Sequence, residues 1–292
     1  MNAPVLAPAV HIDDCTTSVD WNPISASQPT STFAGLFAGF VFASMIVILA
    51  NREKINHRTA DAARALKLLL SAFFGLAIVA YLEGVVRGEQ ECPRAQTESV
   101  INGGSLAVGA VAVLVSLSWL VLAFDRYQSG VLRYFRTVVI SGSAFVVVML
   151  VVSSVGYLDA TSSEKHTTSD WAMCGFGLFA IAATQIVPRI RRLHARELDG
   201  RMPDGEIESR WDRRVSRGAS AGLIFFGFSA LASSAAASRP TRYWYPVPAE
   251  VAYVTAWSSL VGPVIAISLC VFALAQVPDR GKEAPEATGA PS

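Results

Sequence analysis

Seven long apolar stretches follow one another along this chain, and they constrain its fold more than any other feature. A helix of about 20 apolar residues is needed to cross the hydrocarbon layer of a bilayer, which is about 30 Å thick. Backbone N–H and C=O groups find no water in that layer, so a spanning segment must satisfy them within a helix. The sequence therefore predicts an all-α fold, a polytopic transmembrane helix bundle of about seven spans. The predicted spans are residues 33–50, 68–86, 103–124, 138–158, 171–187, 218–238 and 251–277.

The low content of charge agrees with a membrane environment. Only 16% of the 292 residues are charged, whereas 52% are hydrophobic, and the mean hydropathy is +0.41. A soluble domain carries about 25% charged residues. So few charges cannot cover a soluble surface of this size, and we expect the lipid bilayer to be the main partner of the outer surface.

The distribution of basic residues predicts the orientation. If the N-terminus is outside, 19 of the 24 Lys and Arg residues lie in the cytoplasmic segments and the other five lie outside. Cytoplasmic loops of membrane proteins carry such an excess. We therefore expect an N-out, C-in protein of the plasma membrane.

Three regions follow from this topology. Residues 1–32 contain no Lys or Arg and are expected to form an extracytoplasmic tail rather than a signal peptide. Residues 33–277 form the membrane domain. Residues 278–292, rich in Pro, Gly, Ala and Glu, are expected to be a disordered cytoplasmic tail. The largest loop, 188–217, is predicted to form two helical extensions joined by a turn.

One ionisable side chain, Glu83, falls inside a predicted span, and Arg87 follows it at the i, i+4 spacing of one helical face. We expect an ion pair at the outer interface. An ionisable group in a membrane is also a candidate functional group, so a ligand or proton site at Glu83 is the alternative.

Two GxxxG patterns, Gly35 to Gly39 and Gly218 to Gly222, predict close helix packing. Small residues four apart let two helix backbones approach closely. The partner helix could belong to the same bundle or to a second copy. Pro263 within the last span predicts a kink.

The four cysteines include three on the predicted outer side, where disulfides persist. Cys15 and Cys92 both lie in polar segments and are predicted to pair. Cys92 with Cys174 is the alternative, and Cys270 is expected to be a buried apolar residue.

The 188–217 loop is the candidate contact with lipid headgroups or with a protein partner. Arg189, Arg191 and Arg192 directly follow the fifth span, and Trp211 could anchor at the interface. Six acidic residues in the loop offset its nine Arg, so we expect no binding of nucleic acid.

The spans lack the residues of several common activities. No histidine lies in a span, which disfavours a membrane haem and leaves Ser105 without a base for nucleophilic catalysis. No catalytic, cofactor or metal site is predicted, and we expect the protein not to be an enzyme.

The Ala- and Val-rich spans, the preference for Arg over Lys, and the run Cys92-Pro93-Arg94-Ala95 resemble uncharacterised multi-pass membrane proteins of actinobacteria. That resemblance implies no activity. The sequence favours a structural, regulatory or partner-binding membrane component, and a permease or exporter for a neutral or apolar small molecule is the alternative.

Overall fold

The chain folds into a bundle of long helices in the computed structural model, which describes residues 22–51, 59–124, 129–161, 167–198 and 204–274. The described residues contain no strand, so the predicted all-α fold is confirmed. The elements are α1 (Pro23–Ala50), α2 (Thr59–Val86), α3 (Cys92–Phe124), α4 (Ser129–Thr161), α5 (Thr167–Leu198), α6 (Asp204–Ala237), the 3-10 helix η3 (Thr241–Tyr243) and α7 (Ala249–Phe272).

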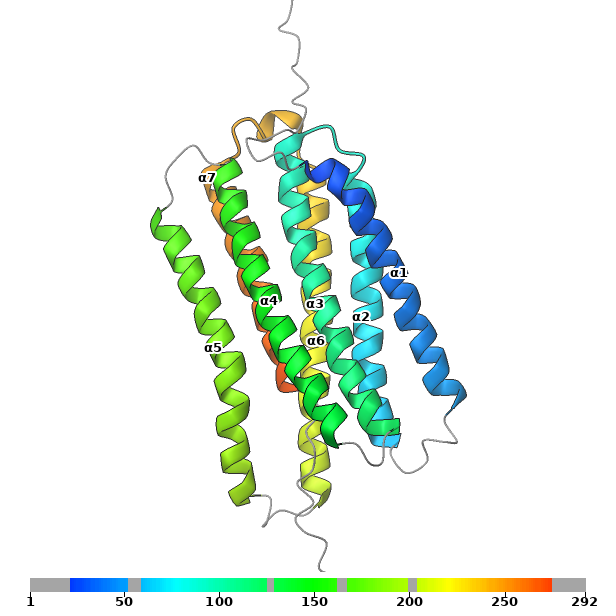
Figure 1. Cartoon of the computed structure of the whole chain (residues 1–292). Coiled ribbons are helices and arrows are strands. Elements are labelled where there is room, and N and C mark those ends of the chain that lie inside the picture. Colours follow the sequence, from blue (N-terminus) through cyan, green and yellow to red (C-terminus); the bar gives the residue numbers. More distant parts are fainter. Residues whose placement is uncertain (1–21, 52–58, 125–128, 162–166, 199–203, 275–292) are drawn as a thin grey trace, which may run out of the picture.

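Successive helices run in opposite directions along the bundle (Figure 1). Short connections favour antiparallel neighbours, and in the described part of the chain each pair of consecutive helices except α5 and α6 packs together extensively. One end of the bundle holds the starts of α1, α3, α5 and α7 together with η3, and we call it the upper end, as in Figure 1. The other end is the lower end.

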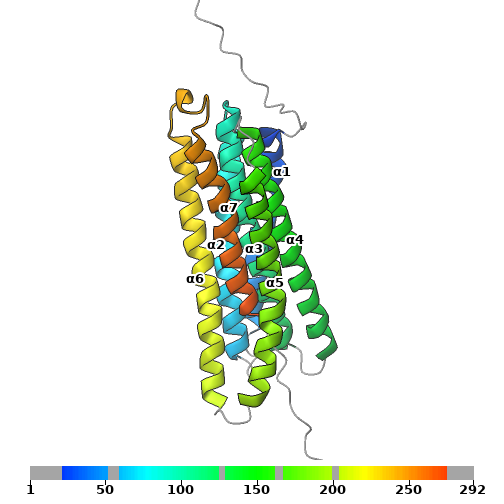
Figure 2. The same ribbon diagram turned by 90° about the vertical axis from the view of Figure 1, so that its left-hand side faces the viewer.

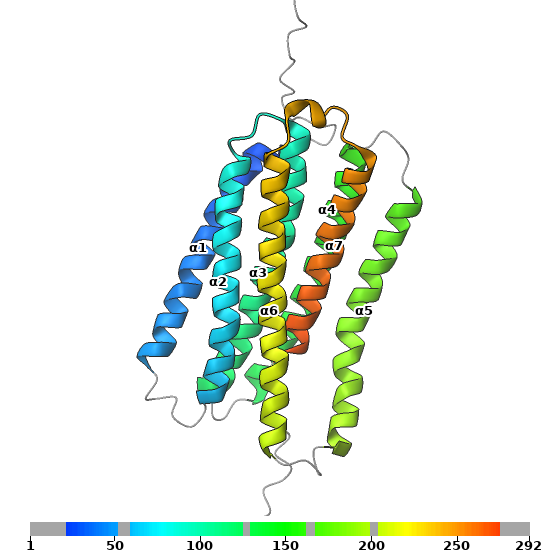
Figure 3. The same cartoon turned by 180° about the vertical axis from the view of Figure 1, so that it is seen from behind.

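Helix α3 is the centre of the bundle and packs against α1, α2, α4, α6 and α7. It can do so because its buried face is rich in small residues, among them Gly104, Gly109 and Ala112. Helix α5 lies at the periphery, where it contacts α4 and α7 (Figures 2 and 3).

Large apolar side chains point away from the bundle over most of its length. A soluble protein rarely exposes a contiguous apolar surface of this extent, whereas lipid tails solvate it well. The most exposed of these side chains include Phe40, Phe145, Val152, Leu178, Phe179, Ile224 and Leu231.

Of the seven α-helices in the described part of the chain, six are long and apolar enough to cross a membrane, and α6 is one of them. Helix α5 is not among the six, and the side chains of its last turns, from residue 187, lie outside the described part of the chain. The membrane character is therefore supported by the structure, while the seventh span and the orientation stay predictions.

Several helices extend beyond the apolar stretches that revealed them. Helix α1 begins at Pro23 rather than at residue 33, because the Asn22 side chain accepts hydrogen bonds from the N–H groups of Ile24 and Ser25 at 2.9 and 3.1 Å. Residues 23–32 of the predicted tail are therefore helical. The extensions expected in the 188–217 loop are present as the end of α5 and the start of α6.

The last helix is shorter than predicted. It ends at Phe272 rather than at residue 277, and the Ala273 N–H bonds to the carbonyl of Cys270 in a tightened final turn. The Ala273 carbonyl in turn accepts a hydrogen bond from the Trp119 indole of α3 at 2.8 Å. Pro278 follows shortly in the sequence and disfavours helix at the residue before it.

Candidate functional site

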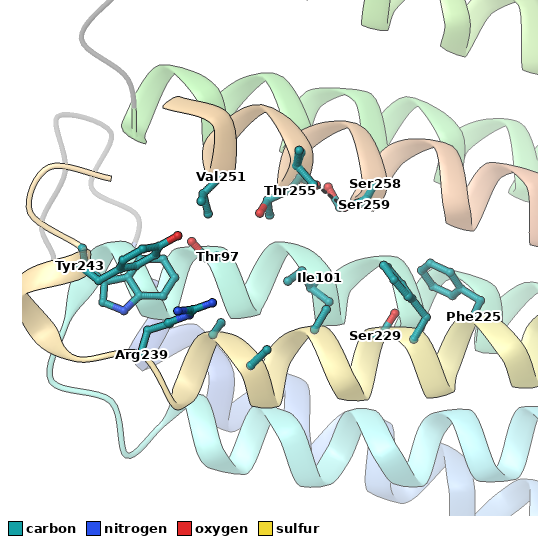
Figure 4. A pocket seen from close by; sticks show the side chains of 16 residues that line it. Thr97, Ile101, Phe225, Ser229, Arg239, Tyr243, Val251, Thr255, Ser258 and Ser259 are labelled. Carbon is teal, nitrogen blue, oxygen red and sulfur yellow. Dashed lines mark hydrogen bonds between the residues drawn. The ribbon is translucent and has the colours of Figure 1, made fainter. Parts of the chain in front are cut away.

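A cavity of about 210 Å³ lies at the upper end between α3, α6 and α7 (Figure 4). The connection between α6 and α7 closes its upper side. Ile101, Val251 and Phe228 give it apolar walls. In Figure 4, Arg239 and Tyr243 lie at one end of the cavity and Phe225 lies at the other. The long axis of the cavity therefore runs from the predicted membrane interface towards the middle of the bundle.

Two polar groups that line this cavity are buried and have no hydrogen-bond partner. Trp244 is 2% exposed, and its indole N–H is unpaired. Ser229 is 1% exposed, and its hydroxyl is also unpaired. A buried donor without a partner costs about 1–3 kcal/mol, so both groups favour a bound molecule that can accept hydrogen bonds.

Arg239 supplies a positive charge at the upper end of the cavity. Its guanidinium lies 5.2 Å from the centre of the Tyr243 ring. Among the described residues, no carboxylate forms an ion pair with it. The charge is therefore free to act on an anion or on a strong hydrogen-bond acceptor.

The upper side of the cavity is fixed to α3 by Arg94. This side chain forms an ion pair with Glu89 and donates a hydrogen bond to the carbonyl oxygen of Arg239 at 3.2 Å. Pro240 precedes η3 and holds the backbone in an extended conformation. The position of Arg239 is thus set by a contact with α3 as well as by the connection itself.

The lower end of the cavity is closed by Phe225. Its ring lies against Gly262 of α7, where an added Cβ would be 2.7 Å from Cε2. It also lies over Gly104 of α3, where an added Cβ would be 3.4 Å from Cζ. The ring therefore needs a glycine at position 262 and is in ordinary contact with Gly104, and it forms the lower wall of the cavity.

A second group of polar side chains lies at the upper end between α2 and α3. Glu83 is 2% exposed, and both Glu98 and Asn102 are 0% exposed. The Asn102 amide lies beside the Glu83 carboxyl group, but neither of its polar atoms has a hydrogen-bond partner of acceptable geometry. Both carboxyl oxygens of Glu98 are also without a partner.

The structure does not bring Glu83 and Arg87 together. Glu83 faces the interior, whereas Arg87 is exposed, and no ion pair joins them. The i, i+4 spacing allowed the contact, but α3 covers Glu83 and so separates it from the side chain at the interface.

Glu98 and Asn102 were missed in the sequence because they precede the apolar stretch that begins at residue 103. Helix α3 begins at Cys92 instead, with Pro93 in its first turn, where the missing N–H of proline costs nothing. The spacing of Glu98 and Asn102, one helical turn apart, was the available signal.

Cys92 is disulfide-bonded, and Cys174 and Cys270 are free thiols. The alternative pairing of Cys92 with Cys174 is therefore wrong. Cys15 lies outside the described residues, so its pairing with Cys92 stays a prediction. Cys270 is 1% exposed, as expected of a buried apolar residue.

The two GxxxG pairs pack differently. Gly218 lies against the α7 backbone, where an added Cβ would be 3.3 Å from the Leu269 carbonyl oxygen. A Cβ added at Gly222 would be 3.0 Å from the Ser71 hydroxyl oxygen. Gly35 faces Ala80 of α2 at 3.9 Å, whereas Gly39 has no atom within 4 Å. Three of the four glycines therefore pack inside the bundle.

The candidate contacts at the lower end are only partly described. Arg189, Arg191 and Arg192 lie on α5, but their side chains are outside what the structure describes. Trp211 packs into the bundle instead of extending to the interface, with its ring 5.8 Å from that of Trp119. The Arg214 guanidinium also lies over the Trp211 ring, 4.8 Å from its centre.

Comparisons with protein-family models, with curated proteins and with solved structures gave no significant match. The resemblance to actinobacterial membrane proteins remains an expectation. The function is therefore argued from the geometry alone.

Proposed function

We propose that this protein is a non-enzymatic binding component of the plasma membrane, and that the upper-end cavity holds a small amphiphile with an anionic head. One observation carries the proposal. Two buried donors without a partner, the Trp244 indole and the Ser229 hydroxyl, line a cavity that has Arg239 at its upper end.

The size of the cavity limits the ligand. A cavity of about 150 Å³ in a protein core can bind benzene, so the present volume of about 210 Å³ suits a group of roughly eight non-hydrogen atoms. Phe228 and Val254, which border the cavity, are 55% and 68% exposed. A longer apolar tail could therefore continue between α6 and α7 into lipid.

The proposed orientation places this cavity outside the cytoplasm. The disulfide of Cys92 lies at the upper end, and disulfides persist in oxidising compartments. The excess of basic residues in the lower-end segments favours the same orientation. The ligand would then enter from the outer leaflet or from the extracytoplasmic solution.

Binding is favoured over catalysis by the polar groups of the cavity. They are hydroxyl, indole and guanidinium groups, and the described lining contains no histidine or carboxylate. A serine nucleophile normally needs such a base. Turnover of a lipid or a peptide by the purified protein would contradict this part of the proposal.

The test compares three ligands with one tail and different heads. Octanoate, octanol and octylamine are titrated against the protein in lipid nanodiscs, with empty nanodiscs as the blank. A hydrogen bond to a charged group contributes about 1.5–3 kcal/mol, so octanoate should bind at least about tenfold more tightly than octanol, and octylamine least.

The variants assign this preference to the cavity. Arg239→Gln should remove the preference for octanoate, whereas Arg242→Gln should keep it, because Arg242 lies in the same connection but does not line the cavity. Equal binding of the three ligands, or an unchanged preference in Arg239→Gln, would contradict the proposal.

A permease for a neutral or apolar small molecule is the second candidate. The observation that favours it is Pro263 within α7, directly beside Gly262 and the Phe225 ring that closes the cavity. A solute could pass only if this ring moved. Flux of octanol through proteoliposomes, faster in Phe225→Ala than in the unaltered protein, would favour transport over simple binding.

A further inference from the structure

The lower half of the cavity has serine hydroxyl groups on two opposite walls. Ser229 belongs to α6, whereas Ser258 and Ser259 belong to α7 across the cavity (Figure 4). Ser229 follows Phe225 by one helical turn. Ser258 precedes Gly262 by one turn, and the Phe225 ring contacts Gly262. Because α6 and α7 run in opposite directions, the serines of both walls lie about one turn above this ring.

The hydroxyl groups of the α7 wall act as hydrogen-bond acceptors. A serine hydroxyl has one proton to donate and two lone pairs that accept. Ser258 donates its proton to the carbonyl of Thr255 at 3.1 Å, and Ser259 donates to the carbonyl of Ala256 at 3.0 Å. The Ser154 hydroxyl, 3.4 Å from that of Ser259, is then the donor of their contact. Each α7 serine therefore keeps a lone pair for a donor inside the cavity.

The α6 wall has the opposite character. The Ser229 hydroxyl is buried, and no group among the described residues accepts its proton. A donor therefore faces two acceptors across the cavity without bonding to them directly. A carbonyl or ether oxygen placed between the walls would accept from Ser229 but would have no proton for α7. A hydroxyl group does both. We call the space between Ser229 and the two α7 serines the hydroxyl site.

The hydroxyl site lies well below the position of the anionic head. Ser229 precedes Ala237, the last residue of α6, by eight residues, which is about 12 Å along the helix axis. Arg239 lies just beyond that end, on the opposite side of the cavity from Phe225 (Figure 4). One small head group cannot contact both Arg239 and Ser229. Two separate polar groups, joined by an apolar segment, are therefore needed to use both positions.

We propose that the ligand of this cavity is a hydroxy acid, with its carboxylate at Arg239 and its hydroxyl group in the hydroxyl site. The inference rests on the proposed binding of an anionic amphiphile and specifies its chemical class. The apolar segment between the two groups lies along Ile101 and Val251. A site that hydrogen-bonds a ligand hydroxyl discriminates against the analogue without it, because the polar groups of the site are then left unpaired.

The first measurement compares octanoate with 8-hydroxyoctanoate, in the same nanodiscs and with empty nanodiscs as the blank. Eight carbons joined by bonds of about 1.5 Å span roughly 10 Å when extended, which suits the separation of the two positions. An apolar cavity end would weaken binding of the hydroxy acid, because a hydroxyl without partners is unfavourable there. The hydroxyl site should instead strengthen it by about three- to tenfold. Equal or weaker binding of 8-hydroxyoctanoate would overturn the proposal.

A third ligand, 8-methoxyoctanoate, tests the need for a proton. Its ether oxygen accepts a hydrogen bond from Ser229 but donates none to the α7 wall. We expect it to bind no more tightly than octanoate. Binding as tight as that of 8-hydroxyoctanoate would contradict the assignment of a hydroxyl group.

The variants assign the effect to α6. Ser229→Ala should remove the advantage of 8-hydroxyoctanoate over octanoate, while octanoate itself still binds and so reports an intact cavity. Ser234→Ala is the matched control, because Ser234 is exposed on the same helix and does not line the cavity. This control should keep the full advantage. An unchanged advantage in Ser229→Ala would overturn the hydroxyl site.

A comparison without any anionic group separates this inference from the proposed binding of an anion. In the hydroxyl site, 1,8-octanediol should bind more tightly than octanol, and Ser229→Ala should remove that difference. This result would support the hydroxyl site even if octanoate bound no better than octanol, which would contradict only the anionic head. Equal binding of the diol and octanol would overturn the hydroxyl site and leave the preference for octanoate intact.

Discussion

Gly104 of α3 lies so close to Pro263 of α7 that an added Cβ would be 2.7 Å from the Cγ atom of the proline ring. The two helices therefore touch at the point where α7 contains its proline. A Cβ added at the neighbouring residue, Gly103, would have no neighbouring atom within 4 Å. Two adjacent glycines of one helix thus have opposite surroundings.

This difference predicts opposite effects of one substitution. Gly104→Ala should lower the free energy of unfolding by about 1–3 kcal/mol, because the rigid proline ring cannot move away. Gly103→Ala should be neutral or stabilising by up to about 1 kcal/mol through helix propensity. Thermal unfolding in one detergent would measure both, and equal effects would contradict the close contact.

The hydrogen bond between Trp119 and Ala273 gives a second prediction. Trp119→Phe removes the indole N–H and leaves the buried Ala273 carbonyl without that donor. We expect a loss of about 1–3 kcal/mol in stability, measured by chemical unfolding. Trp257→Phe is the matched control, since that indole packs against Phe176 and forms no hydrogen bond with the described residues.

The state of the cysteines gives a third prediction. Cys174 and Cys270 are free, so Cys15 is the cysteine of this chain left to pair with Cys92. Peptide mapping without reduction should show this pair, and Cys92→Ser should free the thiol of Cys15. Cys174→Ser should change neither result, and a map with Cys15 free would contradict the pairing.

The separation of Glu83 from Arg87 gives a fourth prediction. Arg87→Gln should change stability by less than about 0.5 kcal/mol, because the side chain is exposed and forms no ion pair with the described residues. A double-mutant cycle with Glu83→Gln should give a coupling energy below about 0.5 kcal/mol. A larger coupling energy would show that the two charges interact after all.

The sequence by itself determined the helices and the membrane environment of this protein. A long apolar stretch in a membrane must form a helix, because its backbone groups find hydrogen-bond partners in lipid only within a helix. The ends of the helices were harder to predict from the sequence, since polar residues such as Glu98 continue a helix beyond its apolar part. Asn22 and Pro93 carried local signals of two helix starts, but hydropathy alone does not detect them.

Only the tertiary structure decided which side chains meet. Spacing along one helix allowed Glu83 to pair with Arg87, yet the neighbouring helix covers Glu83 and brings Asn102 to it instead. Likewise, nothing in the sequence order placed Arg239 and Trp244 over a cavity that Phe225 closes. Such contacts depend on how the helices are rotated and packed against one another, and the apolar pattern of each helix leaves that rotation open.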